Sequence, residues 1–541
     1  MSEDVTPLIF DRWNGIDKQL NPYLLPMDLT DDALNVYGHG DSVMKRPGTR
    51  PWGAGSAGNT AAGPIVDITH FVTAATSPKF FINAVTTARG QNDYGGLAAN
   101  GKIQYALAPW GDPASVWIDV TSTATRAGAF VEELVPCDSI IWRTAYSGQA
   151  ERKITVVTEA AVGAAPADEC VSAEWHKRHL WHFKDDNNTS RFTFSDVDAP
   201  ETYPAANIET VDPRSGTRHL RGGISAGEMM YVGSNEFTYM VTGSTAQSFR
   251  ITRLPFAFGL AGRRAAVAIG GTVLAVAARP MFAMFNDGVH GYEEFDVVAL
   301  TGGDFKSIGG PIWPLLQKAS PTVQVPALSW QYDRARMAHW PAAELAVLVP
   351  NARVPWIDEQ SRMLVFSTRS GGPGAWWSWA YPDQSVSGSE RICSIINAAH
   401  DFYLGMESGK MLGMDWEAAR DDPRGTTAVD IPAYVTTHWI NRERHASAGK
   451  RVFCTGGQKS GGNWTLSYAV APAQGQAIKW RTLRTFDPGN YRGVDLGVCG
   501  DVGAGSFIKY RIDFPADGVR CIMRSLVVGN KNYRRTELAG A

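Results

Sequence analysis

The stretch that decides the fold runs from Tyr231 to Thr252 and reads YVGSNEFTYMVTGSTAQSFRIT. Its apolar and β-branched residues form three short runs with turn residues between them. This pattern predicts strand, turn, strand, turn and strand at a spacing of about ten residues. Such spacing is typical of an antiparallel sandwich, barrel or propeller, because βαβ units would place helical segments between the strands.

The same pattern extends in both directions over residues 51–435. Short runs bounded by turn residues are predicted to be strands. They are Ile65–Val72, Phe80–Thr86, Ile103–Leu107, Val116–Val120, Ile154–Thr158, His179–Phe183, Glu228–Val232, Phe237–Val241, Phe249–Thr252, Thr272–Ala277, Met281–Phe285, Leu345–Val349, Met363–Ser367, Ile392–Ile396 and Phe402–Met406. Asn100-Gly101 and Asp287-Gly288 are predicted to be hairpin turns.

A degenerate repeat favours the propeller among these folds. Trp181-His-Phe, Phe237-Thr-Tyr, Phe282-Ala-Met-Phe and Phe402-Tyr-Leu each place aromatic residues in a predicted strand between two turns. The unit recurs at roughly 40 to 60 residues, a period that suits radial blades. We therefore predict an all-β fold, an irregular β-propeller over residues 51–435 with a number of blades that the sequence leaves open.

Composition agrees with this prediction. The chain has 541 residues, which exceeds one ordinary compact domain, although a closed repetitive β architecture can reach this length. Only 19% of the residues are charged, which argues against coiled coils and long salt-bridged helices. The 55 glycines and 30 prolines favour many turns.

The two ends of the chain differ from the middle. Residues 1–50 are predicted to be an extended N-terminal arm, with a short helix over Thr30–Val36, that packs on its own body or on a neighbouring subunit. Residues 436–541 contain further predicted strands, which form either a small C-terminal β domain or the closing blades. A second short helix is predicted over Ile312–Lys318.

Charge and cysteine usage exclude several classes. The net charge of −3 argues against a protein that grips nucleic acid by neutralising phosphates. The cysteines (137, 170, 393, 454, 499 and 521) form no CxxC pair, so we expect buried, reduced thiols rather than a zinc ribbon. We also expect no secretory signal and no membrane span.

Two clusters could carry chemistry. His176, His179 and His182 could bind a metal, but in one continuous strand His176 and His182 would share a face that His179 opposes, so half-buried imidazoles are the simpler interpretation. Asp196, Asp198 and Glu201 could be the carboxylates of a propeller glycosidase, or could cap turns after a strand.

Two further motifs could have a binding function, but each also has a purely structural interpretation. Trp376-Trp377-Ser-Trp379 could stack on sugars or bases, or could close a blade or a subunit interface. Arg263-Arg264 could meet phosphates, or could lie at a subunit interface or on a channel wall. No GxSxG, Walker or dinucleotide-binding pattern occurs. We therefore predict no catalytic, cofactor-binding or metal-binding residue.

Three segments together resemble a known family. They are Phe10-Asp-Arg-Trp-Asn-Gly15 with Ala33-Leu-Asn35 and Lys45-Arg46-Pro47-Gly48, then Arg178–Phe183 with Phe194-Ser195-Asp196 and Pro200-Glu201-Thr-Tyr203, then Ile269–Val276 with Asn286-Asp-Gly288. In this order they are similar to the tail nozzle proteins of short-tailed bacteriophages, also called tail tubular protein B or tail hub proteins. The resemblance covers about residues 10–50 and 175–310.

The resemblance implies a structural virion protein, not an enzyme, made in the host cytoplasm and located in the virion tail. Members form a ring, usually of six copies, below the adaptor ring of the head-to-tail connector, with tail fibres, tailspikes or tail-tip proteins nearby. The ring surrounds a channel that retains and then releases double-stranded DNA without specific binding.

Two alternatives remain. The first is a propeller glycoside hydrolase or lyase that acts on host surface polysaccharide, with Asp196, Asp198 or Glu201 as acid or base. The second is a cellular propeller scaffold, for which a gene outside a cluster of portal, capsid and fibre genes would be the sign.

Overall fold

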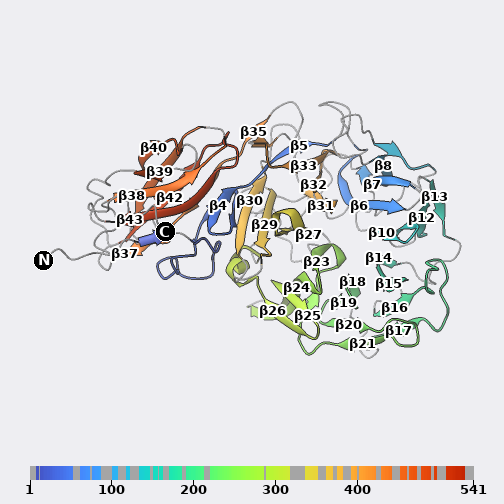
Figure 1. The fold of residues 1–541 in the computed structure, drawn as a ribbon. Coiled ribbons are helices and arrows are strands. Elements are labelled where there is room, and N and C mark those ends of the chain that lie inside the picture. Colours follow the sequence, from blue (N-terminus) through green and yellow to red (C-terminus); the bar gives the residue numbers. More distant parts are fainter. Residues whose placement is uncertain are drawn as a thin grey trace.

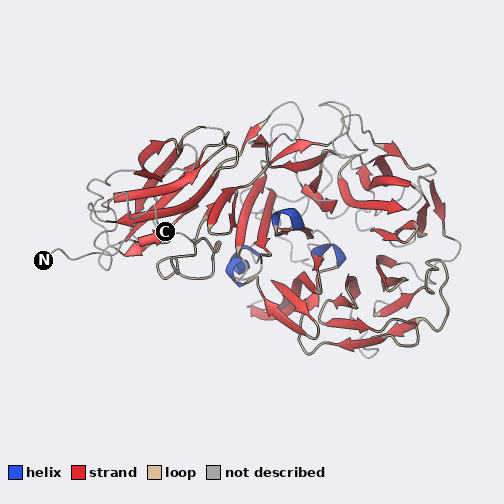
Figure 2. Ribbon diagram, in the orientation of Figure 1, coloured by secondary structure: helices blue, strands red, loops and turns tan. Residues whose placement is uncertain are grey.

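The computed structural model describes most of the chain. The described residues are 8–10, 12–52, 61, 63–73, 76–86, 100–107, 117–121, 133–145, 150–155, 158–162, 170–185, 190–211, 220–285, 288–316, 335–350, 361–369, 375–381, 392–398, 401–418, 420–421, 428–441, 451–459, 462–471, 477–488, 493–495 and 507–529. Over these ranges almost all the regular elements are strands, joined by turns and loops, with a few short helical turns (Figure 2). No helix among them is long and apolar enough to cross a membrane.

Seven antiparallel sheets form the larger part of the described chain, and each of the first four is a meander of four strands. Blade one contains β6 (Ile65–Thr73), β7 (Thr76–Thr86), β8 (Asn100–Leu107) and β9 (Ile118–Asp119); blade two contains β10 (Leu134–Cys137), β11 (Ile140–Arg143), β12 (Arg152–Thr155) and β13 (Thr158–Ala161); blade three contains β14 (Cys170–His176), β15 (His179–Asp185), β16 (Arg191–Phe194) and β17 (Ile208–Thr210); blade four contains β18 (Leu220–Ala226), β19 (Met229–Ser234), β20 (Thr238–Thr242) and β21 (Arg250–Arg253).

Blades five and seven are less regular, whereas blade six is again a meander of four strands. Blade five contains β22 (Gly259–Leu260), β23 (Ala266–Ile269), β24 (Thr272–Phe285), β25 (Gly288–Thr301) and β26 (Asp304–Ser307); blade six contains β27 (Arg336–Trp340), β28 (Leu345–Val349), β29 (Ser361–Ser367) and β30 (Trp376–Tyr381); blade seven contains β31 (Ile392–Ala398), β32 (Asp401–Met406), β33 (Met411–Asp415), β34 (Arg420–Asp421) and β35 (Val429–Asp430). Short helical turns are η1 (Arg263–Ala265), η2 (Gly310–Ile312), α1 (Trp313–Leu316) and η5 (Pro341–Ala343).

The seven sheets close into a ring (Figure 1). The innermost strands contact one another in the cyclic order β6, β10, β14, β18, β23, β27, β31 and again β6. Closure uses a strand from the other end of the chain: β5 (Gly48–Pro51) pairs with β33 as the outer strand after β31, β32 and β33. The ring of blades confirms the predicted irregular β-propeller, whose faces are buried only against their neighbours.

A β-sandwich is appended to blades five to seven. One sheet contains β1 (Leu8–Phe10), β3 (Val36–His39), β4 (Ser42–Lys45), β38 (Arg451–Gly457), β41 (Gly493–Asp495) and β43 (Ile522–Gly529); the other contains β2 (Ala33–Leu34), β36 (Ala433–Thr436), β37 (Ile440–Asn441), β39 (Trp464–Val470), β40 (Arg481–Phe486) and β42 (Phe507–Phe514). One hydrophobic core runs from the sandwich into blades five, six and seven, so the two parts form a joined body.

The N-terminal segment is woven into this sandwich. Strand β1 pairs with β43, and β2 pairs with β36, so residues from both ends of the chain share each sheet. The helix expected over Thr30–Val36 is wrong, because these residues supply β2 and the start of β3 and their backbone groups bond to other strands. The helix expected from Ile312 is confirmed as the short turn formed by η2 and α1.

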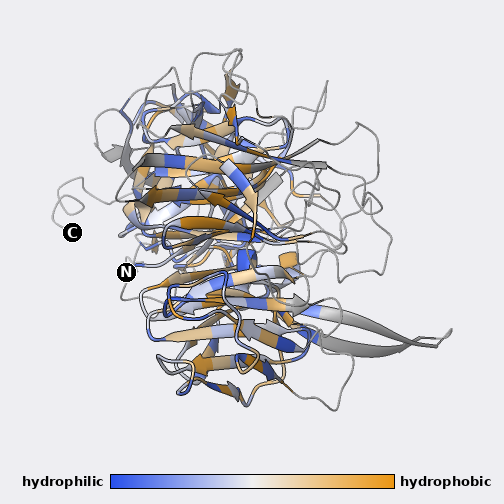
Figure 3. Cartoon of the chain, turned by 90° about the vertical axis from the view of Figure 1, so that its right-hand side faces the viewer, coloured by the Kyte–Doolittle hydropathy of each residue, from blue (hydrophilic) through white to orange (hydrophobic). Residues whose placement is uncertain are grey.

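Two patterns in the sequence, a predicted hairpin turn and the aromatic repeat, do not mark the positions in the blades that were expected from them. Asn100-Gly101 lies inside β8, where the two residues pair with Thr86 and Val85, so the predicted turn at this position is wrong. The four aromatic segments do not occupy equivalent positions either: Trp181 lies in the second strand of blade three, whereas Tyr239 lies in the third strand of blade four. Figure 3 shows instead that apolar residues follow the strands throughout the stacked blades.

Candidate functional site

The predicted histidine cluster lies on a hairpin rather than on one strand. Strands β14 and β15 join through Lys177 and Arg178, both of which have positive φ (50° and 66°). His176 pairs directly with His179 across this turn, so these two side chains share one face of the sheet and His182 lies on the other. The expected grouping of His176 with His182 is therefore wrong, because the chain reverses between them.

His176 and His179 face blade four. Nδ1 of His176 lies 2.6 Å from Oγ of Ser225, and burial lowers the pKa of His176 to about 4, with Lys177 as a second cause. Nδ1 of His179 lies 2.6 Å from the carbonyl oxygen of Ser195, and its ring packs edge-on against Phe249. Both imidazoles are buried within a blade interface, at 1% and 2% exposed, so they lie deeper than the half-buried imidazoles that the simpler interpretation expects.

The predicted acidic cluster lies at the turn after β16. Asp198 has a positive φ and pairs with Arg178, while Oε2 of Glu201 accepts a hydrogen bond from Lys153 Nζ at 2.6 Å. The backbone of Asp196 forms an isolated bridge with Ala199. These contacts agree with acidic residues that shape and cap a turn.

The tryptophan run is the outer strand of blade six. Trp376, Trp377 and Trp379 lie in β30 and are at most 2% exposed, so a stacking platform for sugars or bases is wrong. Trp379 Nε1 donates to the carbonyl oxygen of Val36 at 2.9 Å, and Trp376 Nε1 donates to that of Ile308 at 2.6 Å. These side chains close the blade against the N-terminal segment.

Arg263 and Arg264 lie on η1 near the propeller axis, where they reach blades that are not neighbours of their own. From blade five, Arg264 Nη2 donates to Oδ2 of Asp67 in blade one at 3.0 Å. Its Nε lies 3.9 Å from Oε1 of Glu133, which immediately precedes blade two. Arg263 Nε donates to Oε2 of Glu174 in blade three at 2.7 Å. We call these five residues the axial network.

The axial network is largely buried, with the side chains of Arg263 and Glu174 23% and 12% exposed, and it crosses the centre of the ring. Blade five does not adjoin blade one or blade two in the ring of seven blades, so a contact between them crosses the central axis. Burial raises the pKa of Glu133, and Arg264 and Arg263 oppose that shift. Ser172 Oγ adds a hydrogen bond to Oε2 of Glu133 at 2.9 Å. Arg263 and Arg264 were expected at phosphates, at a subunit interface or on a channel wall, and in the structure both form ion pairs within the chain near the propeller axis.

An exposed apolar loop lies where the propeller meets the sandwich. The amide of Lys18 donates to the carbonyl oxygen of Pro311 beside blade six, and the ring of Tyr23 stacks on Trp439 of the sandwich with centroids 5.6 Å apart. Around these two contacts, Leu20 and Leu24 are 46% and 77% exposed, and Tyr23 and Met27 are each 39% exposed. We call residues 18–27 the junction loop.

The remaining sequence prediction concerns the cysteines. The five cysteines that the structure describes (Cys137, Cys170, Cys393, Cys454 and Cys521) are buried and form no disulfide, as expected. Burial raises the pKa of Cys454 and of Cys521 to about 12, so both stay thiols. Cys499 lies outside the described residues.

Comparisons with known proteins find similar solved structures but no family. No family model and no curated protein matches it. Among solved structures it is similar to BamB from Moraxella catarrhalis (11% identity, 72% of this chain and 94% of that chain, TM-score 0.33). It is also similar to exo-β-1,3-galactanase from Phanerochaete chrysosporium (8%, 90% and 99%, TM-score 0.27) and to the N-terminal domain of Nup159 (7%, 68% and 94%, TM-score 0.31). These similarities carry no argument about function.

Proposed function

We propose that this chain is a structural subunit of the tail nozzle of a short-tailed bacteriophage and assembles into a ring, with six copies as the expected number. The observation that carries the proposal is the junction loop. Four of its large apolar side chains are exposed, although the hydrogen bond of Lys18 and the stacked ring of Tyr23 hold the loop in place. Clustered apolar side chains on a fixed surface are typical of a protein interface. Lateral contact with the next copy would cover them.

The long hairpin of blade five supports assembly in a second way. Among the described strands, β22, β23 and β26 pair only with Thr272–Ala278 of β24 and Val298–Thr301 of β25, whereas β24 and β25 pair with each other along their full length, to Phe285 and Gly288. A two-stranded ribbon is marginally stable on its own in water. A neighbouring copy or another tail protein that contacts this ribbon would supply the missing packing.

The axial network determines where DNA could pass in such a ring. Arg264, Asp67 and Glu133 bridge the propeller axis with ion pairs, whereas the major groove of a DNA duplex alone is about 12 Å wide. The channel of the proposed nozzle therefore lies between copies and not through the propeller of one chain. A net charge of −3 suits a channel wall that DNA passes without binding specifically.

The partners of the proposed nozzle follow from the same resemblance. An adaptor ring would lie above it, and tail fibres, tailspikes or tail-tip proteins would lie beside or below it. Its location would be the virion tail after synthesis in the host cytoplasm. The role requires no catalytic residue; Asp198 and Glu201, the strongest candidates for the alternative hydrolase, are engaged in ion pairs with Arg178 and Lys153.

The test is assembly of the purified chain with its adaptor ring, followed by mass photometry and negative-stain microscopy. Wild type is expected to form closed rings, and Leu24→Asp is expected to remain monomeric. Val197→Asp is the matched control, because Val197 is 53% exposed on a turn of blade three, away from the junction loop. A wild-type chain that stays monomeric with the adaptor, or two variants that behave alike, would overturn the proposal.

A further inference from the structure

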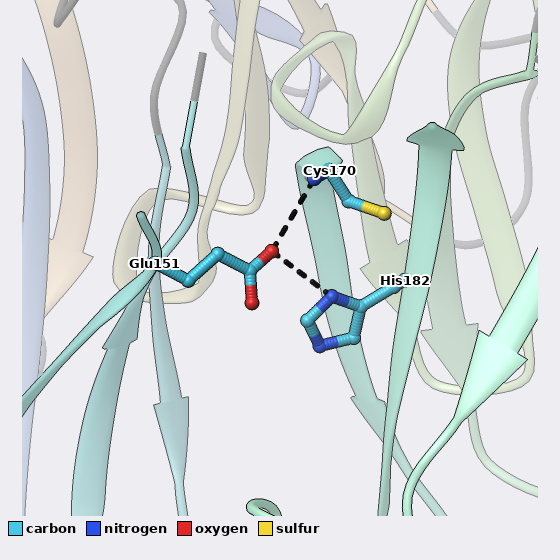
Figure 4. Close-up of side chains that lie close together, drawn as sticks. All are labelled: Glu151, Cys170 and His182. Carbon is cyan, nitrogen blue, oxygen red and sulfur yellow. Dashed lines mark hydrogen bonds and ion pairs between the residues drawn. The ribbon is translucent and has the colours of Figure 1, made fainter. Parts of the chain in front are cut away.

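Glu151, Cys170 and His182 converge in the buried interface between blades two and three. Glu151 immediately precedes β12, Cys170 begins β14, and His182 lies in β15 (Figure 4). One potential ligand atom from each residue lies within 4.8 Å of the other two. The side chains of Glu151 and His182 are 1% and 0% exposed, and Cys170 is 2% exposed. The three residues come from blades that are adjacent in the ring.

The hydrogen bonds of Tyr203 determine where His182 carries its proton. The Tyr203 hydroxyl lies 2.9 Å from Nε2 of His182 and 2.6 Å from the carbonyl oxygen of Pro200. A carbonyl oxygen can only accept, so the single hydroxyl proton of Tyr203 is donated to Pro200. Nε2 of His182 must then donate to the Tyr203 oxygen. In a neutral imidazole this leaves Nδ1 with a lone pair.

That lone pair faces another electron-rich atom. Nδ1 of His182 lies 3.2 Å from Oε1 of Glu151, and it makes no hydrogen bond of acceptable geometry. The other carboxylate oxygen of Glu151 accepts a hydrogen bond from Trp142 Nε1 at 2.9 Å. Oε1 also accepts a long hydrogen bond from the backbone amide of Cys170 at 3.4 Å (Figure 4). A positive charge between the two buried acceptors, either a proton or a metal ion, would stabilise this arrangement.

We propose that Glu151 Oε1, Cys170 Sγ and His182 Nδ1 bind a divalent metal ion of the zinc class. Carboxylate oxygen, thiolate sulfur and imidazole nitrogen form a set that Zn²⁺ accepts, and alkaline-earth ions do not favour sulfur or nitrogen. Tyr203 fixes the tautomer of His182, and Trp142 orients Glu151, which are the outer contacts that metal ligands usually have.

The role of the proposed ion is structural. It would join the beginning of β12 in blade two to β14 and β15 in blade three, where Val135, Trp142, Ala173 and Leu180 form the surrounding apolar core. Among the described residues no fourth His, Cys, Asp or Glu belongs to this group. The fourth coordination position would therefore be taken by a water molecule.

The experiment measures metal in the full-length chain after exposure to Zn²⁺ and removal of loosely bound ions. Wild type is expected to keep one zinc per chain by inductively coupled plasma mass spectrometry, and the Co²⁺-loaded protein is expected to show a thiolate-to-cobalt absorption band. Cys170→Ser and His182→Gln are expected to lose both signals. Cys137→Ser is the matched control, since Cys137 is equally buried in the same interface, and its Sγ contacts the carbonyl oxygen of Val135 at 3.3 Å rather than the ligand group.

If a ligand variant fails to fold, measurements on the wild-type protein alone still test the proposal. A strong chelator is expected to lower the melting temperature of wild type, and added Zn²⁺ is expected to restore it. Wild type that holds no stoichiometric zinc and gives no cobalt band would overturn the proposal in favour of a proton shared between Glu151 and His182. Equal zinc content in the Cys170→Ser, His182→Gln and Cys137→Ser proteins would overturn it as well.

Discussion

Arg46 and Asp421 form a fully buried ion pair across 375 positions of the chain. Nη1 of Arg46 donates to Oδ1 of Asp421 at 3.0 Å, and Nη2 contacts Oδ2, so the pair is bidentate. Nε of the same guanidinium donates to Oδ1 of Asn35 at 3.0 Å, and Nη2 also donates to the carbonyl oxygen of Ala380. One side chain therefore fixes the N-terminal segment to blade six and to blade seven.

Removing one partner of this pair should destabilise the propeller strongly. Asp421→Ala leaves the Arg46 charge buried without its counter-ion, and we expect the free energy of unfolding to fall by about 3–5 kcal/mol. Chemical denaturation at constant pH measures the change. The control is Asp430→Ala, since Asp430 forms a solvent-exposed pair with Arg420 nearby, for which about 0–1 kcal/mol is expected. Equal losses in both variants would contradict the assigned role of Arg46.

The pairing of β5, the strand that closes the ring of blades, should depend on the absence of a side chain at Gly48. A Cβ atom added to Gly48 would lie 2.2 Å from the carbonyl oxygen of Arg420, which is backbone and cannot move aside cheaply. Gly48→Ala is therefore expected to loosen β5 and to lower the free energy of unfolding by at least about 1–3 kcal/mol. Gly413→Ala in the paired strand β33 has its nearest atom at 3.5 Å and should be tolerated. Limited proteolysis between the propeller and the sandwich would report the difference.

These contacts explain part of what the sequence could and could not predict. The all-β class was predictable because alternating apolar runs and turn residues are local signals, as in Tyr231–Thr252, which forms parts of β19, β20 and β21. The closure of the wheel was not, because the pairing of Gly48–Pro51 with β33 depends on residues more than three hundred positions away. No local pattern marks Gly48 as the start of a blade strand.

The sequence-based prediction of the histidine site was wrong for a related reason. The turn at Lys177 and Arg178 contains neither Gly nor Asn, yet both residues adopt positive φ. Without a turn signal, the histidines were interpreted as one strand, and His182 was assigned to the wrong face. Its actual neighbours, Glu151 and Cys170, lie outside the histidine run, and Glu151 belongs to another blade. Convergence between blades is a tertiary property that spacing along one strand cannot reveal.

The axial network should contribute strongly to stability through Arg264. Arg264→Met removes the cation that faces Asp67 and Glu133, and two buried carboxylates then lie near each other without it. We expect a loss of about 3–5 kcal/mol in the free energy of unfolding. Adding Asp67→Asn and Glu133→Gln to Arg264→Met should recover part of the loss, because neutral amides avoid the repulsion. Arg178→Met, which breaks an exposed pair with Asp198, is the control with an expected change of about 0–1 kcal/mol.

The stability of the chain should fall in mild acid, and His176 should account for a measurable part of the fall. Burial, with a contribution from Lys177, lowers the pKa of His176 to about 4, whereas the unfolded chain binds this proton near pH 6.5. Between these values the unfolded state binds more protons than the folded state, so stability rises with pH from about 4 to 6.5 and is lost as pH falls through that window. At about 1.4 kcal/mol per pKa unit, the contribution is about 3 kcal/mol at most.

Burial also lowers the pKa of His70 and of His339, so the wild-type curve contains their contributions too. The difference between wild type and His176→Asn isolates His176: their denaturation midpoints, compared at pH 7.5 and at pH 4.5, should be further apart at pH 7.5. A separation that does not change with pH would show that His176 binds its proton equally well in the folded and unfolded chains.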